Sequence, residues 1–187
     1  EEFRNRTIAD LSAVRKFAPD REVRDRLAAA QWTEETVKAA RASGVTPELA
    51  IKAPHAVQSA TWRWIGTPQT DLADVIRYAE RVGFDDSDVV HAARAGVPAE
   101  RYREARSAGL RHIQLSEYEK YGVDDIPTMR ILNRANLHGR HFAALRSIGF
   151  TSPDTAIAAL RSGYGGPIPD LVNEYSLSRD EIDTLRP

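Results

Sequence analysis

Residues 83–135 can be written as four successive lines: GFDDSDVVHAARA from Gly83, GVPAERYREARSA from Gly96, GLRHIQLSEYEKY from Gly109 and GVDDIPTMRILNRA from Gly122. The four glycines are 13 residues apart, and an apolar residue follows each of them. After single extra residues, the same phase resumes at Asn136, Gly149 and Gly163. Similarity at a fixed spacing indicates an internal repeat, which must be interpreted before any single residue.

One repeat unit predicts a short helix followed by a turn. The glycine suits the left-handed residue just past a helix end, and the apolar residue after it can pack back onto that helix. We expect the next helix to be capped by one of four side chains: Thr46, Asp85, Asp124 or Thr151. Apolar residues recur near the seventh, tenth and thirteenth places of each unit, in steps that keep them on one helical face. In three units these are Val89, Ala92 and Ala95; Tyr102, Ala105 and Ala108; and Leu115, Tyr118 and Tyr121.

A helix of about nine residues is only about 13 Å long and is not stable alone in water. It must therefore bury its apolar stripe against neighbouring units. Counting in thirteens in both directions accounts for up to fourteen short helices. We predict an all-α chain, an array of short helices in an approximately 13-residue repeat, forming a compact α-solenoid or superhelical bundle. We expect a single domain over 1–187, less regular over 1–69 and regular over 70–187.

Composition narrows the classes of protein. The chain has no cysteine, which excludes disulfides and thiolate metal sites and fits a reducing compartment. No window approaches 18 consecutive apolar residues, so we expect no membrane span. The unit length and signature residues differ from those of tetratricopeptide, ankyrin and armadillo repeats. Both ends carry many charges, which suits the caps of an array. We expect a cytoplasmic monomer without a cofactor.

The segment QSATWRWIG holds Trp62 and Trp64 between two helix-breaking prolines, Pro54 and Pro68. Two residues apart on a helix, the two rings point in different directions, so we expect only one of them in the core. The other is a candidate anchor for a partner protein, because tryptophan is enriched at binding hot spots. The alternative is that both rings pack between repeat units.

Residues 126–153 contain four arginines and no acidic residue. Arg130 and Arg134 are four apart and share a helix face, and Arg140 follows in the next unit. This basic face could bind an acidic surface of a partner or a phosphate. The alternative is that it complements acidic neighbouring units, since the flanking segments 44–125 and 154–187 each carry a net charge of −3.

Nucleic acid is a second candidate partner. It would be bound by an arginine-rich face, which we list as Arg101, Arg103, Arg106, Arg111, Arg130, Arg134 and Arg140. Phosphate contacts dominate the affinity of such proteins, so dedicated binders are usually basic, whereas this chain has a net charge of −1.

Signals for catalysis or metal binding are weak. Asp85, Asp86 and Asp88 stand at a helix start, where acids act as caps, and they lack the spacing of a calcium loop. His138 and His141 have no further obvious zinc ligands around them, and we predict no metal site. No nucleophile or phosphate-binding motif occurs. A small enzyme would require a deep polar pocket that leaves no sequence motif.

These observations favour a non-enzymatic protein–protein interaction scaffold or regulator. Repeat arrays expose long surfaces that serve as binding faces. The candidate contacts are listed as Trp62, Trp64, Arg130, Arg134 and Arg140.

Overall fold

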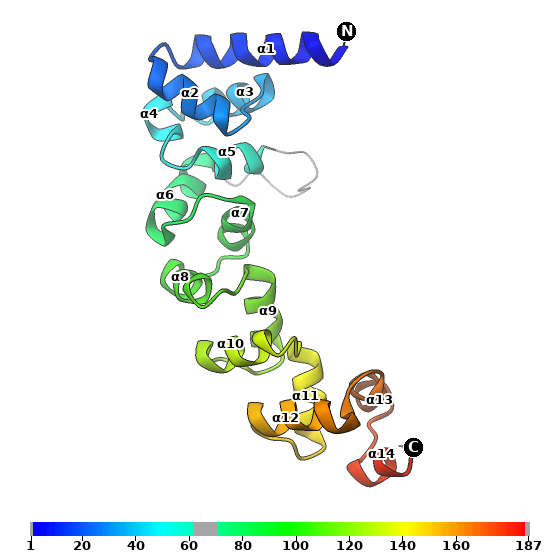
Figure 1. The fold of residues 1–187 in the computed structure, drawn as a ribbon. Helices are drawn as coiled ribbons and strands as arrows, with labels where there is room; N and C mark the ends of the chain where they lie inside the picture. The colour runs from blue at the N-terminus through cyan, green and yellow to red at the C-terminus, as the bar shows by residue number, and fades with distance from the viewer. Residues whose placement is uncertain (1, 62–70, 186–187) are drawn as a thin grey trace. The chain divides into compact units, whose positions relative to one another are not determined.

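The computed structural model describes residues 2–61 and 71–185, and within these ranges every regular element is helical (Figure 1). The chain is therefore all-α, as predicted. It divides into two compact units, Glu1–Arg103 and Glu104–Pro187, with α8 (Ala99–Ser107) crossing the division. The predicted single domain and its division at residue 69 stay predictions. No described helix combines the length and apolar character that a membrane span requires.

The helices of the first unit are α1 (Glu2–Phe17), α2 (Arg21–Ala29), α3 (Glu34–Ala42), α4 (Pro47–Ala50), α5 (Pro54–Ala60), α6 (Leu72–Val82) and α7 (Ser87–Arg94). Those of the second unit are α9 (His112–Lys120), α10 (Ile126–Arg134), α11 (Gly139–Ser147), α12 (Pro153–Ala159), a π-helical turn η1 (Leu160–Tyr164), α13 (Ile168–Tyr175) and α14 (Arg179–Leu185).

Most of the described turns between helices contain a left-handed residue, whereas the connections between α1 and α2 and between α4 and α5 contain none. Gly96, for example, has φ +69°, and the N–H of Val97 after it reaches back to the carbonyl of Ala92 at 3.1 Å. The same bond recurs from Leu110 and Val123, and these two apolar residues are buried. This bond pattern satisfies carbonyl groups that the helix end would otherwise leave open. Three non-glycine residues adopt the same left-handed conformation in the equivalent turns: Gln31, Asn136 and Ser176.

The predicted helix caps are correct in one case and displaced in three. Thr46 caps α4 by accepting the Leu49 N–H at 3.3 Å, as predicted. At the other three turns the cap is one residue later, on Asp86, Asp125 and Ser152. The reason is that one more extended residue follows the apolar residue of the turn before the helix begins. Two residues in a row that can both cap a helix hide this difference from sequence reasoning.

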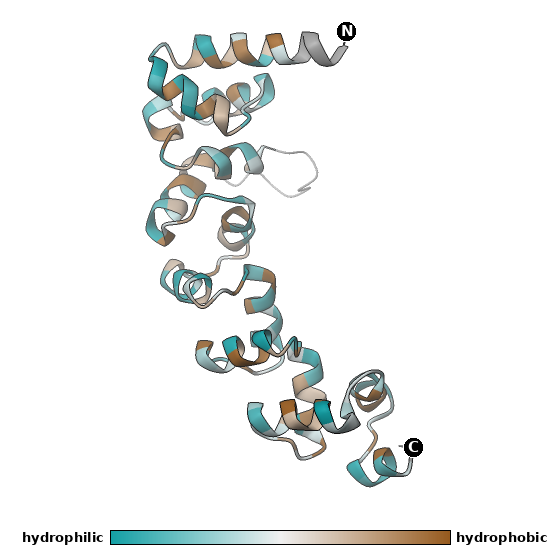
Figure 2. Cartoon of the chain, in the orientation of Figure 1, coloured by the Kyte–Doolittle hydropathy of each residue, from teal (hydrophilic) through white to brown (hydrophobic). Residues whose placement is uncertain are grey.

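The predicted apolar stripe is also too wide. Its seventh and tenth positions are buried, as at Tyr102 and Ala105. The thirteenth position is not: Ala95 is exposed, and Tyr121 is only partly buried. Both residues are the C-caps of their helices, where the backbone turns away from the helix axis, so their side chains leave the buried face. Apolar and hydrophilic residues accordingly alternate within the helices (Figure 2).

Inside each unit, helices pack on their next-but-one neighbours. In the first unit α1 contacts α3, α3 contacts α5 and α5 contacts α7, while α2 and α6 both contact α4. In the second unit α11 contacts both α9 and α13, and α10 contacts α12. Alternate helices therefore form two layers within a unit. The apolar core of the first unit, from Val14 to Tyr102, lies among these helices.

Arginines link helices to the C-terminal ends of their next-but-one neighbours, as two examples show. Arg41 on α3 donates to the carbonyl of Lys16 near the end of α1 at 3.0 Å. Arg146 on α11 donates at 3.2 Å to the carbonyls of Tyr121 and Gly122 just past α9. Carboxylates do the same for helix starts: Asp85 accepts the N–H groups of His55 and Ala56, at 3.2 and 2.7 Å, at the start of α5. Side chains from one helix thus satisfy backbone groups that another leaves open.

Buried tyrosines fix the next connection. Tyr78 donates its hydroxyl to the carbonyl of Val97, and Tyr118 donates to that of Leu137, each at 2.9 Å and each 19 residues along the chain. Burial raises the pKa of both tyrosines to about 12, and nearby Glu117 adds to the effect at Tyr118. Each hydroxyl donates a hydrogen bond to a turn carbonyl. It can do so only while it keeps its proton.

We expect alkaline pH to destabilise the protein through these two groups. The unfolded chain loses the tyrosine proton near pH 10, whereas the folded chain keeps it until about pH 12. Their contribution to stability is fully present below pH 10 and is lost as the pH rises towards 12, by up to about 3 kcal/mol for each tyrosine. Urea unfolding followed by circular dichroism across this range measures the loss.

The matched controls are Tyr78→Phe and Tyr118→Phe. Each should cost about 1–3 kcal/mol at neutral pH, because a turn carbonyl loses its donor. Each should also reduce the alkaline loss, since one titrating group is gone. An alkaline loss that is unchanged in both variants would contradict the assignment.

Candidate functional site

The structure places the predicted contact residues in different surroundings. Trp62 and Trp64 lie outside the described residues. Arg130 and Arg134 are exposed on α10, and Arg140 is exposed at the start of α11. None of these three guanidinium groups has a hydrogen-bond or ion-pair partner in the described part of the chain. All three are therefore available to a ligand.

The other four arginines proposed for nucleic acid are not available in the same way. Arg101, Arg103, Arg106 and Arg111 each already make an interaction. Arg103 also reaches the carbonyl of Arg81 at 3.5 Å. These four residues therefore already have partners within the protein.

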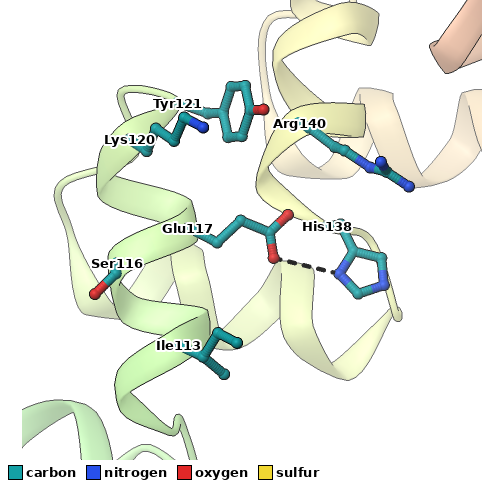
Figure 3. A pocket seen from close by; sticks show the side chains of 7 residues that line it. All are labelled: Ile113, Ser116, Glu117, Lys120, Tyr121, His138 and Arg140. Carbon is teal, nitrogen blue, oxygen red and sulfur yellow. Dashed lines mark ion pairs between the residues drawn. The ribbon is translucent and has the colours of Figure 1, made fainter. Parts of the chain in front are cut away.

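A pocket of about 540 Å³ lies between α9 and the start of α11 (Figure 3). It is lined by Ile113, Ser116, Glu117, Lys120, Tyr121, His138 and Arg140. Of the three available arginines only Arg140 lines it. The whole lining belongs to the second unit, so the pocket is complete within one compact body.

The first wall is one face of α9. Leu115 and Tyr118 turn inward and are buried. Ile113, Glu117 and Lys120 are three or four residues apart, so they share the opposite, outward face. Ile113 is 63% exposed, which makes it a large apolar side chain left open to solvent at one end of this face.

The second wall is held against α9 by a close backbone approach. A Cβ atom on Gly139 would lie 3.1 Å from the Glu117 carbonyl oxygen and from Tyr118 Cα, so only glycine fits here without a shift. The Tyr118 hydroxyl bonds the Leu137 carbonyl on the same turn. Both contacts fix the chain between Leu137 and Arg140. The two walls are therefore set by the packing of the fold.

The electrostatics of the pocket favour an anion. Glu117 pairs with His138, with 3.5 Å between its Oε2 and the ring Nδ1 (Figure 3). The Lys120 ammonium lies 5.5 Å from the centre of the Tyr121 ring. Arg140 has no partner for its guanidinium among the described residues. The lining thus holds two cations and one carboxylate, and the carboxylate is already engaged by an imidazole.

The pocket does not assemble a nucleophile or a metal site from its described residues. Ser116 points to the opposite side of α9 from His138, so its hydroxyl is not in line with the Glu117–His138 pair (Figure 3). His141 lies edge-on to His138, with ring centres 5.8 Å apart, and its Nε2 is 3.4 Å from Asp170 Oδ1. No three His, Asp or Glu side chains in the described ranges lie close enough to hold a metal ion.

Sequence reasoning missed most of this pocket. It found Arg140 through the acid-free segment and noticed His138, but it did not single out Ile113, Glu117 or Lys120. The available signal was Ile113, an isoleucine two residues before the buried Leu115 and therefore on the polar face of the predicted helix. Asp88 stands in the first turn of α7, as predicted, but it is also buried and accepts the Tyr102 hydroxyl at 2.7 Å, which the sequence did not indicate.

Comparisons of the chain with protein-family models, with curated proteins and with solved structures found no match. The geometry of the site therefore carries the functional argument alone.

We expect Gly139→Ala to destabilise the second unit by about 1–3 kcal/mol and to open the pocket, because the added methyl pushes α11 away from α9. The usual effect in a helix is the reverse, since alanine is the better helix former by about 1 kcal/mol. Urea unfolding measures the change. Gly165→Ala is the control, because its Cβ would meet its nearest neighbour, the Leu160 carbonyl oxygen, at an ordinary 3.5 Å. Equal effects of the two substitutions would contradict the close approach.

Proposed function

We propose that this protein is a non-enzymatic interaction module that binds another protein through the pocket between α9 and α11. The observation that supports this most is the open side chain of Ile113 in the same pocket as two cations, Lys120 and Arg140, that have no carboxylate partner in the described ranges. Apolar patches rimmed by polar residues mark interaction sites on soluble proteins, and we take Ile113 as the apolar part of such a site. A partner protein can supply both an apolar residue to cover Ile113 and an acidic residue to pair with the cations.

Three features favour a protein partner over nucleic acid. The arginines are divided between residues that already have partners and three that do not, and only Arg140 of those three lines the pocket. The second feature is the carboxylate of Glu117 in the middle of the lining, which would repel a polyanion. An exposed isoleucine also contributes nothing to binding a phosphate backbone.

A non-enzymatic role fits the arrangement of the pocket. General acid–base catalysis needs a base within hydrogen-bond reach of the group that it activates. His138 faces Glu117 on one side, and Ser116, the serine of the lining, points away from this pair. The proposed non-enzymatic role is therefore based on the binding surface of the pocket, and not on a reaction that its residues would catalyse.

The test is affinity capture from a nuclease-treated native lysate with three forms of the protein: wild type, Ile113→Asp and Ile131→Asp. Ile131 is the matched control, an isoleucine that is 44% exposed on α10 and lies outside the pocket. We expect a stoichiometric protein partner with the wild type and with Ile131→Asp, and at least a tenfold loss with Ile113→Asp.

Circular dichroism establishes that both variants keep the helical fold. Equal capture by all three forms would exclude the pocket as the binding site. Wild-type capture is repeated from an untreated lysate. Bound material that appears only without nuclease would favour nucleic acid instead, and the affinity should then fall steeply with salt concentration.

A further inference from the structure

We infer that the pocket recognises an extended peptide segment with an apolar residue and, three positions away, an acidic residue. This inference rests on the proposed function and specifies the partner chemistry for the same pocket. The two halves of the motif correspond to the two ends of the outward face of α9.

The acidic half is assigned by the cations. Lys120 ends the outward face of α9, and Arg140 stands across the pocket on α11. Neither has an ion-pair partner in the described ranges. A carboxylate that reaches an ammonium or a guanidinium accepts charge-assisted hydrogen bonds, which are shorter and stronger than neutral ones. The Gly139 and Tyr118 contacts hold the start of α11 in place, so Arg140 projects from a fixed backbone.

The apolar half is assigned by Ile113. This side chain is 63% exposed, the largest exposed fraction among the described large apolar residues. Covering an apolar side chain is favourable by about 25 cal/mol for each Å² removed from water. A leucine or isoleucine of the partner would cover Ile113 and would itself leave water. A peptide therefore needs contacts at both ends of the pocket, with Ile113 and with the cations, to bind tightly.

The spacing follows from helix geometry. Ile113 and Lys120 are seven residues apart on a helix that rises about 1.5 Å per residue, which separates them by about 10 Å. An extended chain advances about 3.3 Å per residue, so three steps along it span about 10 Å. An apolar residue over Ile113 thus places the third residue beyond it near Lys120 and Arg140.

Glu117 restricts what can lie between the two ends. It is placed between Ile113 and Lys120 on α9, and its carboxylate pairs with His138 on the facing wall (Figure 3). An acidic residue at either central position of the peptide would face this carboxylate. Repulsion of that kind gives selectivity by disfavouring the wrong partner. The site should therefore reject a uniformly acidic segment and prefer neutral central residues.

Fluorescein-labelled synthetic peptides of one length test this directly by fluorescence anisotropy. The reference peptide carries Leu-Ser-Ser-Glu with capped ends. Three others carry Leu-Ser-Ser-Gln, Leu-Glu-Ser-Ser and Leu-Glu-Glu-Glu. We expect the reference peptide to bind at least tenfold more tightly than each of the other three, and its affinity to fall as salt screens the ion pair.

Arg140→Glu and Arg130→Glu form the matched pair of protein variants. Both make the same charge change on an available arginine of the second unit, but only Arg140 lines the pocket. Arg140→Glu should weaken the reference peptide at least tenfold, while Arg130→Glu should change it less than twofold. Circular dichroism of both variants checks that the fold is kept.

The results separate this inference from the proposed function. Equal binding of the glutamate and glutamine peptides, or equal loss in both arginine variants, would overturn the inference. If capture of a protein still depended on Ile113, the proposed function would stand without it. An unlabelled oligonucleotide that displaces the peptide in proportion to its length would overturn the inference in favour of nucleic acid.

Discussion

The helices of this protein are so short that most of each one is an end. An α-helix leaves four N–H groups and four carbonyl groups without partners in its own hydrogen-bond ladder. In a helix of nine residues, such as α9, nearly every residue therefore carries one such open group. The fold depends on supplying partners for them. Local turns provide some, and side chains from next-but-one helices provide others.

This requirement gives many charged residues a structural task. Arg41 and Arg146 donate to the carbonyl ends of α1 and α9, and Asp85 accepts from the N–H groups that begin α5. A hydrogen bond to a charged group contributes about 1.5–3 kcal/mol, more than a typical neutral one. Such side chains hold alternate helices in register while their aliphatic portions cover the surface. The 22 arginines of the chain are thus divided between structural and available roles.

Local rules were enough to predict the helices and turns, and long-range contacts were not. Gly96 and Gly122 could be placed at left-handed turns because that conformation penalises any other side chain within a single turn. The role of Asp85 could not be predicted, because its partners at α5 lie about 30 residues earlier in the chain. The acid beside it, Asp86, satisfies the same local pattern. The pocket was missed for the same reason. Glu117 lies on α9 and His138 stands at the N-cap of α11, so the two residues meet only when these helices pack together.

The division of charged residues also changes how a basic segment should be interpreted. An acid-free stretch looks like one binding face, but Arg146 in that stretch serves the end of α9, whereas Arg140 has no described partner. The useful signal is therefore an unsatisfied cation beside an apolar side chain that the fold leaves open. At the pocket both features are held by backbone packing: Gly139 sets the distance between the walls, and Tyr118 bonds the turn that carries His138 towards Glu117. A site built this way loses little conformational entropy on binding, because its backbone is already ordered. Its selectivity then follows from the fixed spacing between Ile113 and Lys120 and from the carboxylate of Glu117 between them.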